Sequence, residues 1–494
     1  MSTASAAPPA SGRATAPRPH RVLAVLGLAQ LMVVLDTTIV NIALPSAQVD
    51  LGFSDGSRPW IITAYALAFA ALLLLGGRLC DLFGRKPAFL IGAAGFAIAS
   101  ALGGIAPSFA VLVTARALQG VFAALLAPAI LSLLNTTFTE PGERARAFGV
   151  FGAIGASGTV LGLLVGGSLT QFLDWRWTMF INVAFAAVVT LAGARLLTHT
   201  TDKGGSRLDL PGAALISAGL FALVHGFSNA ESHSWASPST WAPLAAGTVL
   251  ITVFVRWQRR VADPLLPLGV LRDRDRAAAF SALLITGAGL FGVLLFLTYY
   301  LQINRGFSPV TTKLAFLPMI VAMMAVAQVS TTRLLPVLGA KKVLPAAFVV
   351  SGAGLVWLTG TTLTSGYWLD IMPPLVVIGA GLGAIVPPAM SLATQNVPAQ
   401  DAGVASATVN VMQQVGGSIG TALLNTLAAG AATAHLAGRN PTDPAVQGQA
   451  ALHSYTTAFA WAAALFFLGA LVTAVLHRTR ETPGDETEAP ASAA

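Results

Sequence analysis

The sequence contains very little cysteine and very little charge. Cys80 is its one cysteine, which excludes an intramolecular disulfide and any metal or iron–sulfur site that needs several cysteines. Only 10% of the 494 residues are charged, whereas 55% are hydrophobic. This balance excludes a string of soluble domains and is typical of a chain that lies in lipid.

Other absences exclude whole classes of function. No glycine-rich loop ending in Lys-Ser or Lys-Thr occurs, which argues against ATP-driven transport. There is also neither a convergent cluster of His, Cys and acidic residues nor a sizeable soluble segment. A polytopic membrane enzyme or a sensor would need one of these features.

What the chain has instead is a series of apolar runs, each long enough to cross about 30 Å of hydrocarbon. We therefore predict an all-α polytopic membrane protein with fourteen transmembrane helices. The expected spans lie near residues 22–45, 59–77, 88–106, 108–134, 147–171, 177–197, 210–228, 241–257, 277–301, 312–333, 343–363, 369–393, 402–430 and 454–476.

The basic residues indicate the orientation of these spans. Of the 28 Lys and Arg residues, 22 fall on the side of the N-terminus, five fall on the other side, and Arg116 lies within a span. Since basic loops stay in the cytoplasm, both termini are predicted to be cytoplasmic. The net charge of +8 is thus an orientation signal, and no nucleic-acid partner is expected.

An internal repeat divides the chain. Arg78, Leu79, Gly84 and Lys86 match Arg333, Leu334, Gly339 and Lys341 at one constant offset. We predict a tail over residues 1–21, a six-helix half over 22–197, a linker with two extra helices over 198–276, a second six-helix half over 277–476 and a tail over 477–494. Transporters built from parallel repeats of this kind bind substrate between the two halves.

Asp36 and Arg116 are the two charged residues well inside an apolar run. Asp36 lies nine residues from Pro45, roughly 13 Å along a helix, and Arg116 lies eight residues from Ser108, roughly 12 Å. The equal depths predict that the two side chains meet. Burial favours the protonated carboxyl, so Asp36 is a candidate proton carrier or, alternatively, a permanently paired carboxylate. Arg116 is correspondingly a participant in proton transfer or a structural counter-ion.

Several segments resemble motifs of the major facilitator superfamily, in its branch of fourteen-span drug:proton antiporters. GRLCDLFGRK, at 77–86, resembles the family's G-x-L-a-D-r-x-G-r-k loop, and LDTTIVNIALP, at 35–45, resembles its first-span motif. Arg116, Gln119 and Gly120 resemble its l-x-x-R-x-x-q-G motif. The resemblance implies a cytoplasmic conformational gate, carried here by Gly77, Asp81, Gly84 and Arg85. Leu82 stands where the family usually has Arg, which removes one contact of that gate.

A glycine ladder in the fifth span resembles the family's antiporter motif. Gly158, Gly162, Gly166 and Gly167 match it, and Leu163 replaces its proline. Small residues allow close helix packing in lipid, so the packing role is expected to survive the substitution. The substitution leaves the direction of transport open.

Further polar residues are candidates for a transport cavity: Thr37, Asn41, Gln119 and His225. Thr37 and Asn41 follow Asp36 at helical spacing, and His225 is alternatively a helix-packing hydrogen bonder. Trp175 and Trp177 fit an interfacial belt at a membrane surface.

The resemblance implies proton-coupled efflux of small amphipathic drugs by alternating access, with no cofactor other than the proton gradient. It points to a monomer in a bacterial cytoplasmic membrane that is similar to actinomycete antibiotic-resistance exporters. Its partners would be an amphipathic small molecule, protons and the lipid bilayer. Transport of a metabolite, a lipid or a siderophore on the same scaffold is the alternative.

Overall fold

The computed structural model describes residues 19–53, 57, 59–198, 208–232, 237–440 and 443–476. Within these ranges the chain is helical and has no strand. This follows from its composition, because in lipid each backbone polar group must be satisfied within its own segment. Thirteen of these helices are long and apolar enough to cross a membrane, and α5 is a further helix of similar length.

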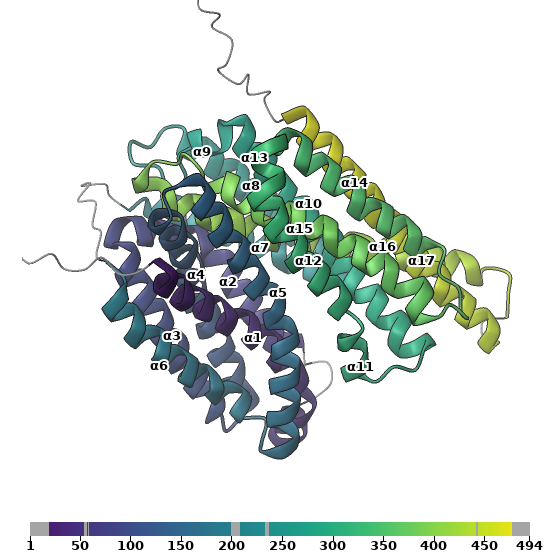
Figure 1. The fold of residues 1–494 in the computed structure, drawn as a ribbon. Coiled ribbons are helices and arrows are strands. Elements are labelled where there is room, and N and C mark those ends of the chain that lie inside the picture. The colour runs from purple at the N-terminus through teal and green to yellow at the C-terminus, as the bar shows by residue number, and fades with distance from the viewer. Residues whose placement is uncertain are drawn as a thin grey trace, which may run out of the picture.

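The long helices form two groups that lie side by side (Figure 1). The first group comprises α1 (Pro19–Leu51), α2 (Pro59–Phe83), α3 (Arg85–Gly104), α4 (Phe109–Thr137), α5 (Pro141–Phe172) and α6 (Trp177–Leu196). The second group comprises α10 (Arg274–Tyr299), α12 (Leu317–Val329), α14 (Ala340–Thr359), α15 (Met372–Thr394), α16 (Ala402–Leu436) and α17 (Pro444–Leu476).

Short pieces complete the second group. They are α9 (Gly269–Arg272), α11 (Pro309–Leu314), α13 (Leu335–Leu338), a 3₁₀ turn at Ala399–Asp401 and π-helical turns at Tyr300–Asn304, Ser330–Leu334 and Tyr367–Ile371. The predicted tenth span is therefore not one regular helix, since Pro309–Leu338 is divided into several pieces. Other helices outrun their predicted spans: α1 begins at Pro19, within the predicted tail, and α17 begins at Pro444. Hydropathy identifies only the part of a helix that lies in lipid, and the helix itself continues beyond that part.

Both groups have the same internal arrangement. In the first, α2 packs on α4, α3 on α4 and α6, and α1 on α5 and α6. In the second, α12 packs on α15, α14 on α15 and α17, and α10 on α16 and α17. Gly84 and Gly339, matched by the sequence repeat, occupy equivalent places because each precedes the first residue of a helix with φ of 94° and 73°. Residues that carry a side chain rarely adopt this positive-φ backbone conformation, so glycine is needed at both turns.

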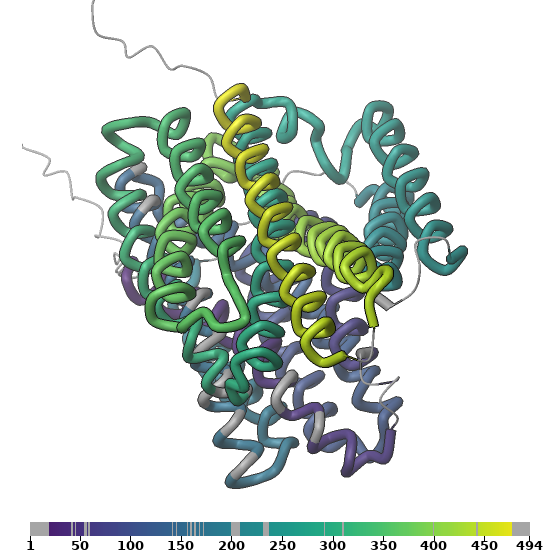
Figure 2. Tube along the Cα trace, turned by 90° about the vertical axis from the view of Figure 1, so that its right-hand side faces the viewer, coloured from purple at the N-terminus to yellow at the C-terminus, as the bar shows by residue number. Residues whose placement is uncertain are grey.

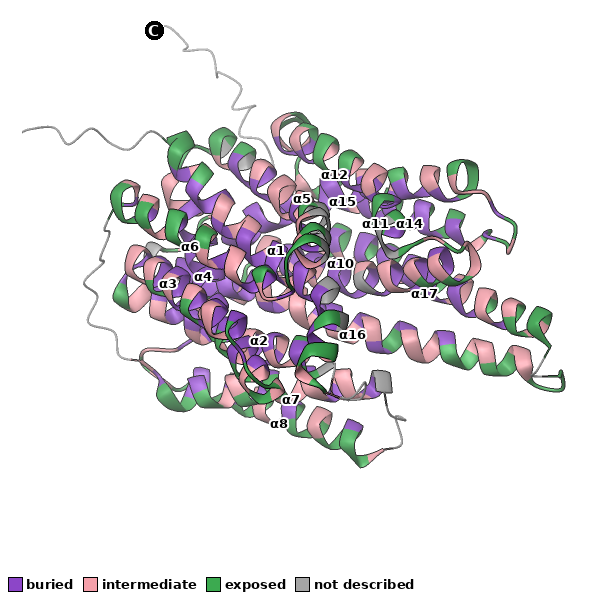
Figure 3. Ribbon diagram, turned by 90° about the horizontal axis from the view of Figure 1, so that it is seen from below, coloured by how far each residue is buried: buried purple, intermediate pink, exposed green. Residues whose placement is uncertain are grey.

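The two groups meet along a seam formed by α2 and α4 against α16, and by α5 against α12 and α15. Buried residues concentrate inside each group and at this seam (Figure 3). We call the end of the first group that carries the α2–α3 turn the Asp81 end, and the opposite end, where α1 stops, the Asp50 end.

The extra pair, α7 (Leu210–Ser232) and α8 (Pro238–Gln258), stands beside the two groups (Figure 2). α7 contacts α2 of the first group and α16 of the second. One apolar cluster joins all three helices, with Leu73 and Leu74 of α2, Ile216 and Leu220 of α7, and Val404 of α16. The extra pair thus covers one side of the seam.

Candidate functional site

Asp36 and Arg116 form a buried ion pair inside the first group. Nη1 of Arg116 donates to Oδ2 of Asp36 at 2.6 Å. Asp36 is 0% and Arg116 is 1% exposed. The equal depths estimated from the sequence correctly predicted this contact between α1 and α4.

Two side-chain amides complete the surroundings of the Asp36 carboxylate. Nε2 of Gln119 donates to Oδ1 at 3.1 Å, and Nδ2 of Asn182 donates to the same oxygen at 2.6 Å. Gln119 is held on both sides, because its Oε1 accepts from Arg116 at 2.7 Å and its Nε2 also donates to Ser100 at 2.7 Å. Gln119, Asn182 and Ser100 are all 0% exposed.

Arg116 has further partners on α2. Its Nε donates to the carbonyl oxygen of Ile61 at 3.3 Å, and its guanidinium lies 4.6 Å from the centre of the Tyr65 ring. A buried charge needs a partner of opposite sign and hydrogen bonds for its remaining polar atoms. This site, which we call the Asp36 cluster (Asp36, Tyr65, Ser100, Arg116, Gln119 and Asn182), supplies both and draws on α1, α2, α3, α4 and α6.

Sequence reasoning missed Asn182, Ser100 and Tyr65. Asn182 lies in an otherwise apolar stretch of α6, and a buried amide in lipid is a signal that could have identified it. Ser100 and Tyr65 carried no comparable signal, because isolated hydroxyls are common in membrane helices.

The remaining polar candidates either have other described contacts or lie outside the described residues. Oγ1 of Thr37 donates to the carbonyl oxygen of Val34 at 2.7 Å on its own helix, and the side chain of Asn41 lies outside the described residues. His225 is on α7, where its ring stacks on Phe221 and its Nε2 lies 3.3 Å from Nδ2 of Asn229. His225 therefore has the helix-packing environment that was the alternative interpretation.

The Gly77–Lys86 segment, expected to be a loop, lies in the end of α2 and the start of α3 with only Gly84 between them, and it contacts the second group at the Asp81 end. Oδ1 of Asp81 accepts from the backbone N–H of Gly403 at 2.8 Å, and Oδ2 accepts from that of Val404 at 3.1 Å. A carboxylate is favourable here because the first turn of a helix, α16, has free N–H groups and a partial positive charge. Gly77 lies so close to α16 that a Cβ would be 2.6 Å from Ala407 Cβ. Arg85 is buried at the start of α3, one residue beyond Gly84.

The glycine ladder of α5 faces two neighbours. Toward the Asp50 end, Gly158 lies against Val34 and Gly162 against Thr38, both on α1. Toward the Asp81 end, a Cβ on Gly149 would come 3.2 Å from Gln328 and Thr331 of the second group. Gly166 is buried, whereas Gly167 and Leu163 have no described side-chain surroundings. α5 thus links the helix that carries Asp36 to the opposite half.

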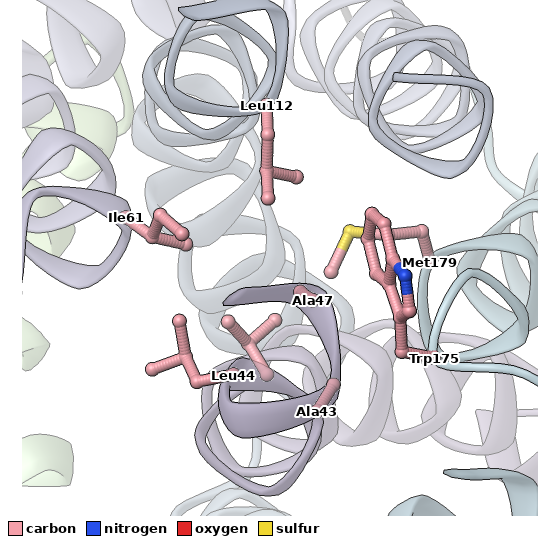
Figure 4. Close-up of a pocket in the computed structure, with 8 residues that line it drawn as sticks. Ala43, Leu44, Ala47, Ile61, Leu112, Trp175 and Met179 are labelled. Atoms are coloured by element: carbon pink, nitrogen blue, oxygen red, sulfur yellow. The ribbon is translucent and has the colours of Figure 1, made fainter. Parts of the chain in front are cut away.

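Beyond Asp36, toward the Asp50 end, lies a small apolar cavity (Figure 4). Its volume is about 10 Å³, and it is lined by Val40, Ala43, Leu44, Ala47, Ile61, Leu112, Trp175 and Met179. A space of this size holds roughly one water molecule, so it is too small for a drug.

Asp50, Trp175 and Arg176 close this end of the first group. Oδ2 of Asp50 accepts from Nη1 of Arg176 at 2.5 Å and from the Trp175 indole at 3.1 Å. These two donors hold the pKa of Asp50 below its usual value. Of the two tryptophans predicted for an interfacial belt, Trp175 is 3% exposed and packs against its neighbours at this end, whereas Trp177 is 49% exposed.

Comparison with known proteins gives consistent results. The sequence model described as the Major Facilitator Superfamily matches residues 26–421. A puromycin resistance protein of Streptomyces alboniger is 47% identical over 98% of this chain and 96% of its own length. A cephamycin export protein of Amycolatopsis lactamdurans is 37% identical over 81% of this chain and 83% of its own length.

Solved structures share the fold at low sequence identity. The human organic anion transporter MFSD10 has a TM-score of 0.65 with 16% identity, covering 92% of this chain and all of that one. The transporter FucP in its outward conformation has a TM-score of 0.58 with 15% identity, covering 92% and 99%.

Proposed function

Since the chain belongs to the major facilitator superfamily, we propose that it exports small amphipathic drugs in exchange for protons. The drug binds between the two helix groups, and alternating access carries it across a bacterial cytoplasmic membrane. The names of the relatives support this substrate class, because they include resistance to puromycin and export of cephamycin. They favour a drug over a metabolite, a lipid or a siderophore.

The observation that carries the proton coupling is the Asp36 cluster. A carboxylate that is 0% exposed, and whose hydrogen-bond donors are all buried, sits on the helix that packs against α5. Ionisable groups within a membrane are costly and mark ion or proton pathways. Asp36 is the proton carrier in this proposal, and Arg116 favours release of the proton by stabilising the carboxylate.

The orientation follows from the basic residues. Arg78, Arg85, Lys86 and Arg333 lie at the Asp81 end, which we assign to the cytoplasm together with both termini. The Asp81 contacts with α16 then act as the cytoplasmic gate, and protons reach Asp36 from the Asp50 end. The working unit is a monomer that needs no cofactor beyond the proton gradient.

Puromycin is the first substrate to test, because of the similarity to the puromycin resistance protein. The chain and its Asp36→Asn variant would be expressed in an efflux-deficient bacterium, and drug susceptibility and pH-gradient-dependent efflux would be measured over a panel of antibiotics. The matched control is Asp443→Asn, which neutralises an exposed acid at the start of α17.

We expect the wild type and Asp443→Asn to lower drug accumulation when a proton gradient is present, and Asp36→Asn to lose this effect. Gradient-driven export that persists unchanged in Asp36→Asn would exclude Asp36 as the carrier. A wild-type protein that exports no drug of the panel would contradict drug export and favour another transported compound.

A further inference from the structure

The Asp36 cluster is built for the ionised carboxylate. Oδ2 receives a hydrogen bond from Arg116, and Oδ1 receives hydrogen bonds from Gln119 and Asn182. In each of these hydrogen bonds an N–H group donates to the carboxylate. A protonated Asp36 carries an O–H group that must itself find an acceptor, because an unpaired buried donor is costly.

Most acceptors around Asp36 already accept a hydrogen bond. Oε1 of Gln119 accepts from Arg116, Oγ of Ser100 accepts from Gln119, and the carbonyl oxygen of Ile61 accepts from Arg116. Among the described amide and carbonyl oxygens of the cluster, Oδ1 of Asn182 is buried and has no hydrogen-bond partner. It belongs to the amide whose Nδ2 already contacts Asp36 at 2.6 Å.

We propose that Asn182 is the positioning residue that allows Asp36 to exchange its proton, by turning its side-chain amide. With Asp36 ionised, Nδ2 of Asn182 donates to Oδ1 of the carboxylate. When a proton from the outer solution forms an O–H bond on Oδ1, the amide rotates and its own Oδ1 accepts that hydrogen. Release of the proton reverses the rotation. The inference rests on the proposed proton-coupled function.

Asn182 can turn, whereas Gln119 cannot. The terminal torsion of an amide side chain has two nearly equivalent orientations. Gln119 is fixed because both ends of its amide have partners, namely Arg116 and Ser100. Before the rotation, Oδ1 of Asn182 is unpaired, and after it Nδ2 is unpaired instead. The rotation therefore does not increase the number of unpaired polar atoms. Without rotation, the Asp36 O–H would face the Asn182 N–H, donor against donor.

The other printed contacts of Asp36 come from Arg116 and Gln119 and are both N–H donors. Arg116 and Tyr65 are the other charged and titratable groups of the cluster; a guanidinium only donates, and the Tyr65 ring lies against Arg116. α3 contributes Ser100, which already accepts from Gln119. α5 packs on α1 through glycines that lie against Val34 and Thr38, so its contact with the helix that carries Asp36 contains no charged side chain.

Two variants of almost the same shape as Asn separate the switch from packing. Asn182→Leu neither donates nor accepts, and Asn182→Asp can do both once it carries a proton. Purified proteins in liposomes would be loaded with puromycin, and export would be measured as a function of external pH under an imposed pH gradient. Puromycin binding without a gradient reports whether each variant is folded.

We expect Asn182→Leu to bind puromycin normally but to lose gradient-driven export by about tenfold or more. We expect Asn182→Asp to export with its pH profile shifted to higher pH, because two neighbouring carboxyls hold a proton more tightly. Wild-type export by Asn182→Leu, or equal loss in both variants with no shift of the pH profile, would overturn the proposal.

An infrared measurement on the wild type tests the rotation independently of transport and of variant folding. The protein would carry ¹³C at its asparagine side-chain carbonyls, and difference spectra would be recorded on acidification. We expect one amide band to shift together with the appearance of a carboxylic acid band, and both changes to be absent in Asp36→Asn. A carboxylic acid band without an amide shift would overturn the switch. Absence of the acid band would instead contradict the proposed role of Asp36.

Discussion

Thr38 of α1 lies directly over Gly162 of α5, so that a Cβ at position 162 would overlap Oγ1 of the threonine. The hydroxyl itself donates to the carbonyl oxygen of Leu35 at 2.9 Å on its own helix. Thr38 and Gly162 are therefore in van der Waals contact and are not joined by a hydrogen bond from this hydroxyl. The contact matters because α1 carries Asp36 on another face, while α5 reaches the second group through Gly149.

Gly162→Ala is expected to abolish or strongly reduce drug export, because the added methyl group forces α1 and α5 apart. Overpacking of this kind costs about 1–3 kcal/mol of folding free energy. The measurement is efflux per molecule of membrane-inserted protein, together with the thermal unfolding midpoint in detergent.

Thr38→Ala provides the matched control, since it removes the overlapping oxygen. The double variant should recover part of the export lost in Gly162→Ala. Equal loss in the single and double variants would mean that Gly162 acts through something other than its contact with Thr38.

Asp81→Asn is expected to weaken the contact between α2 and α16. The two carboxylate oxygens each accept from one N–H group, and in Asn one of these oxygens becomes an NH2 group that faces the N–H of Gly403 or Val404, donor against donor. We therefore expect the population of molecules open at the Asp81 end to increase. Labelling of a cysteine at Ala407, in a protein that lacks Cys80, would report the opening, since Ala407 is 0% exposed at this seam. Unchanged labelling would contradict a gating role for Asp81.

The sequence predicted the Asp36–Arg116 contact, but it could mark Asn182 only as a polar residue in an apolar helix and could not predict its contact with Asp36. Two opposite charges in apolar runs have strong reasons to meet, and the depth of each follows from helix geometry. The partner amide depends on how α6 is rotated and packed, and its apolar neighbours do not determine this. The breaks in Pro309–Leu338 were missed for a similar reason, because hydropathy does not distinguish an α-helix from a π-helical turn.

The hydrogen bonds of Asp50 are expected to make the folding stability of the protein depend on pH. Its pKa is lowered in the folded protein by Arg176 and Trp175. Stabilisation by the pair is therefore fully present above the carboxyl's unfolded pKa of about 3.9 and is lost as the pH falls through the lower folded pKa. Asp50→Asn should lower the unfolding temperature at pH 7, and this difference from wild type should vanish in strong acid. A difference that is independent of pH would show that the charge of Asp50 is not its cause.

Asp209 is expected to hold the α7–α8 pair together. It is 7% exposed and accepts from the backbone N–H of Gly212 at 2.9 Å, from the Trp257 indole at 3.0 Å and from Nε2 of Gln258 at 2.7 Å. Asp209→Ala leaves buried donors unpaired, at a cost of about 1–3 kcal/mol each. Limited proteolysis should cut the variant faster between α6 and α10. A cleavage pattern like that of Asp263→Ala, a more exposed acid in the same linker, would contradict this role.

The repeat also predicts how many protons accompany each drug. Gly162 and Gly417 are 417 − 162 = 255 residues apart, and the same offset places Phe291 and Ile371 where Asp36 and Arg116 stand. The second half therefore has no counterpart of the proton-carrying pair, and we expect one proton per transport cycle. In liposomes, the drug gradient that just balances a known pH gradient gives the ratio. If balance requires a drug gradient equal to the square of the proton gradient, a second carrier exists, and retention of half of this coupling in Asp36→Asn would locate it outside the Asp36 cluster.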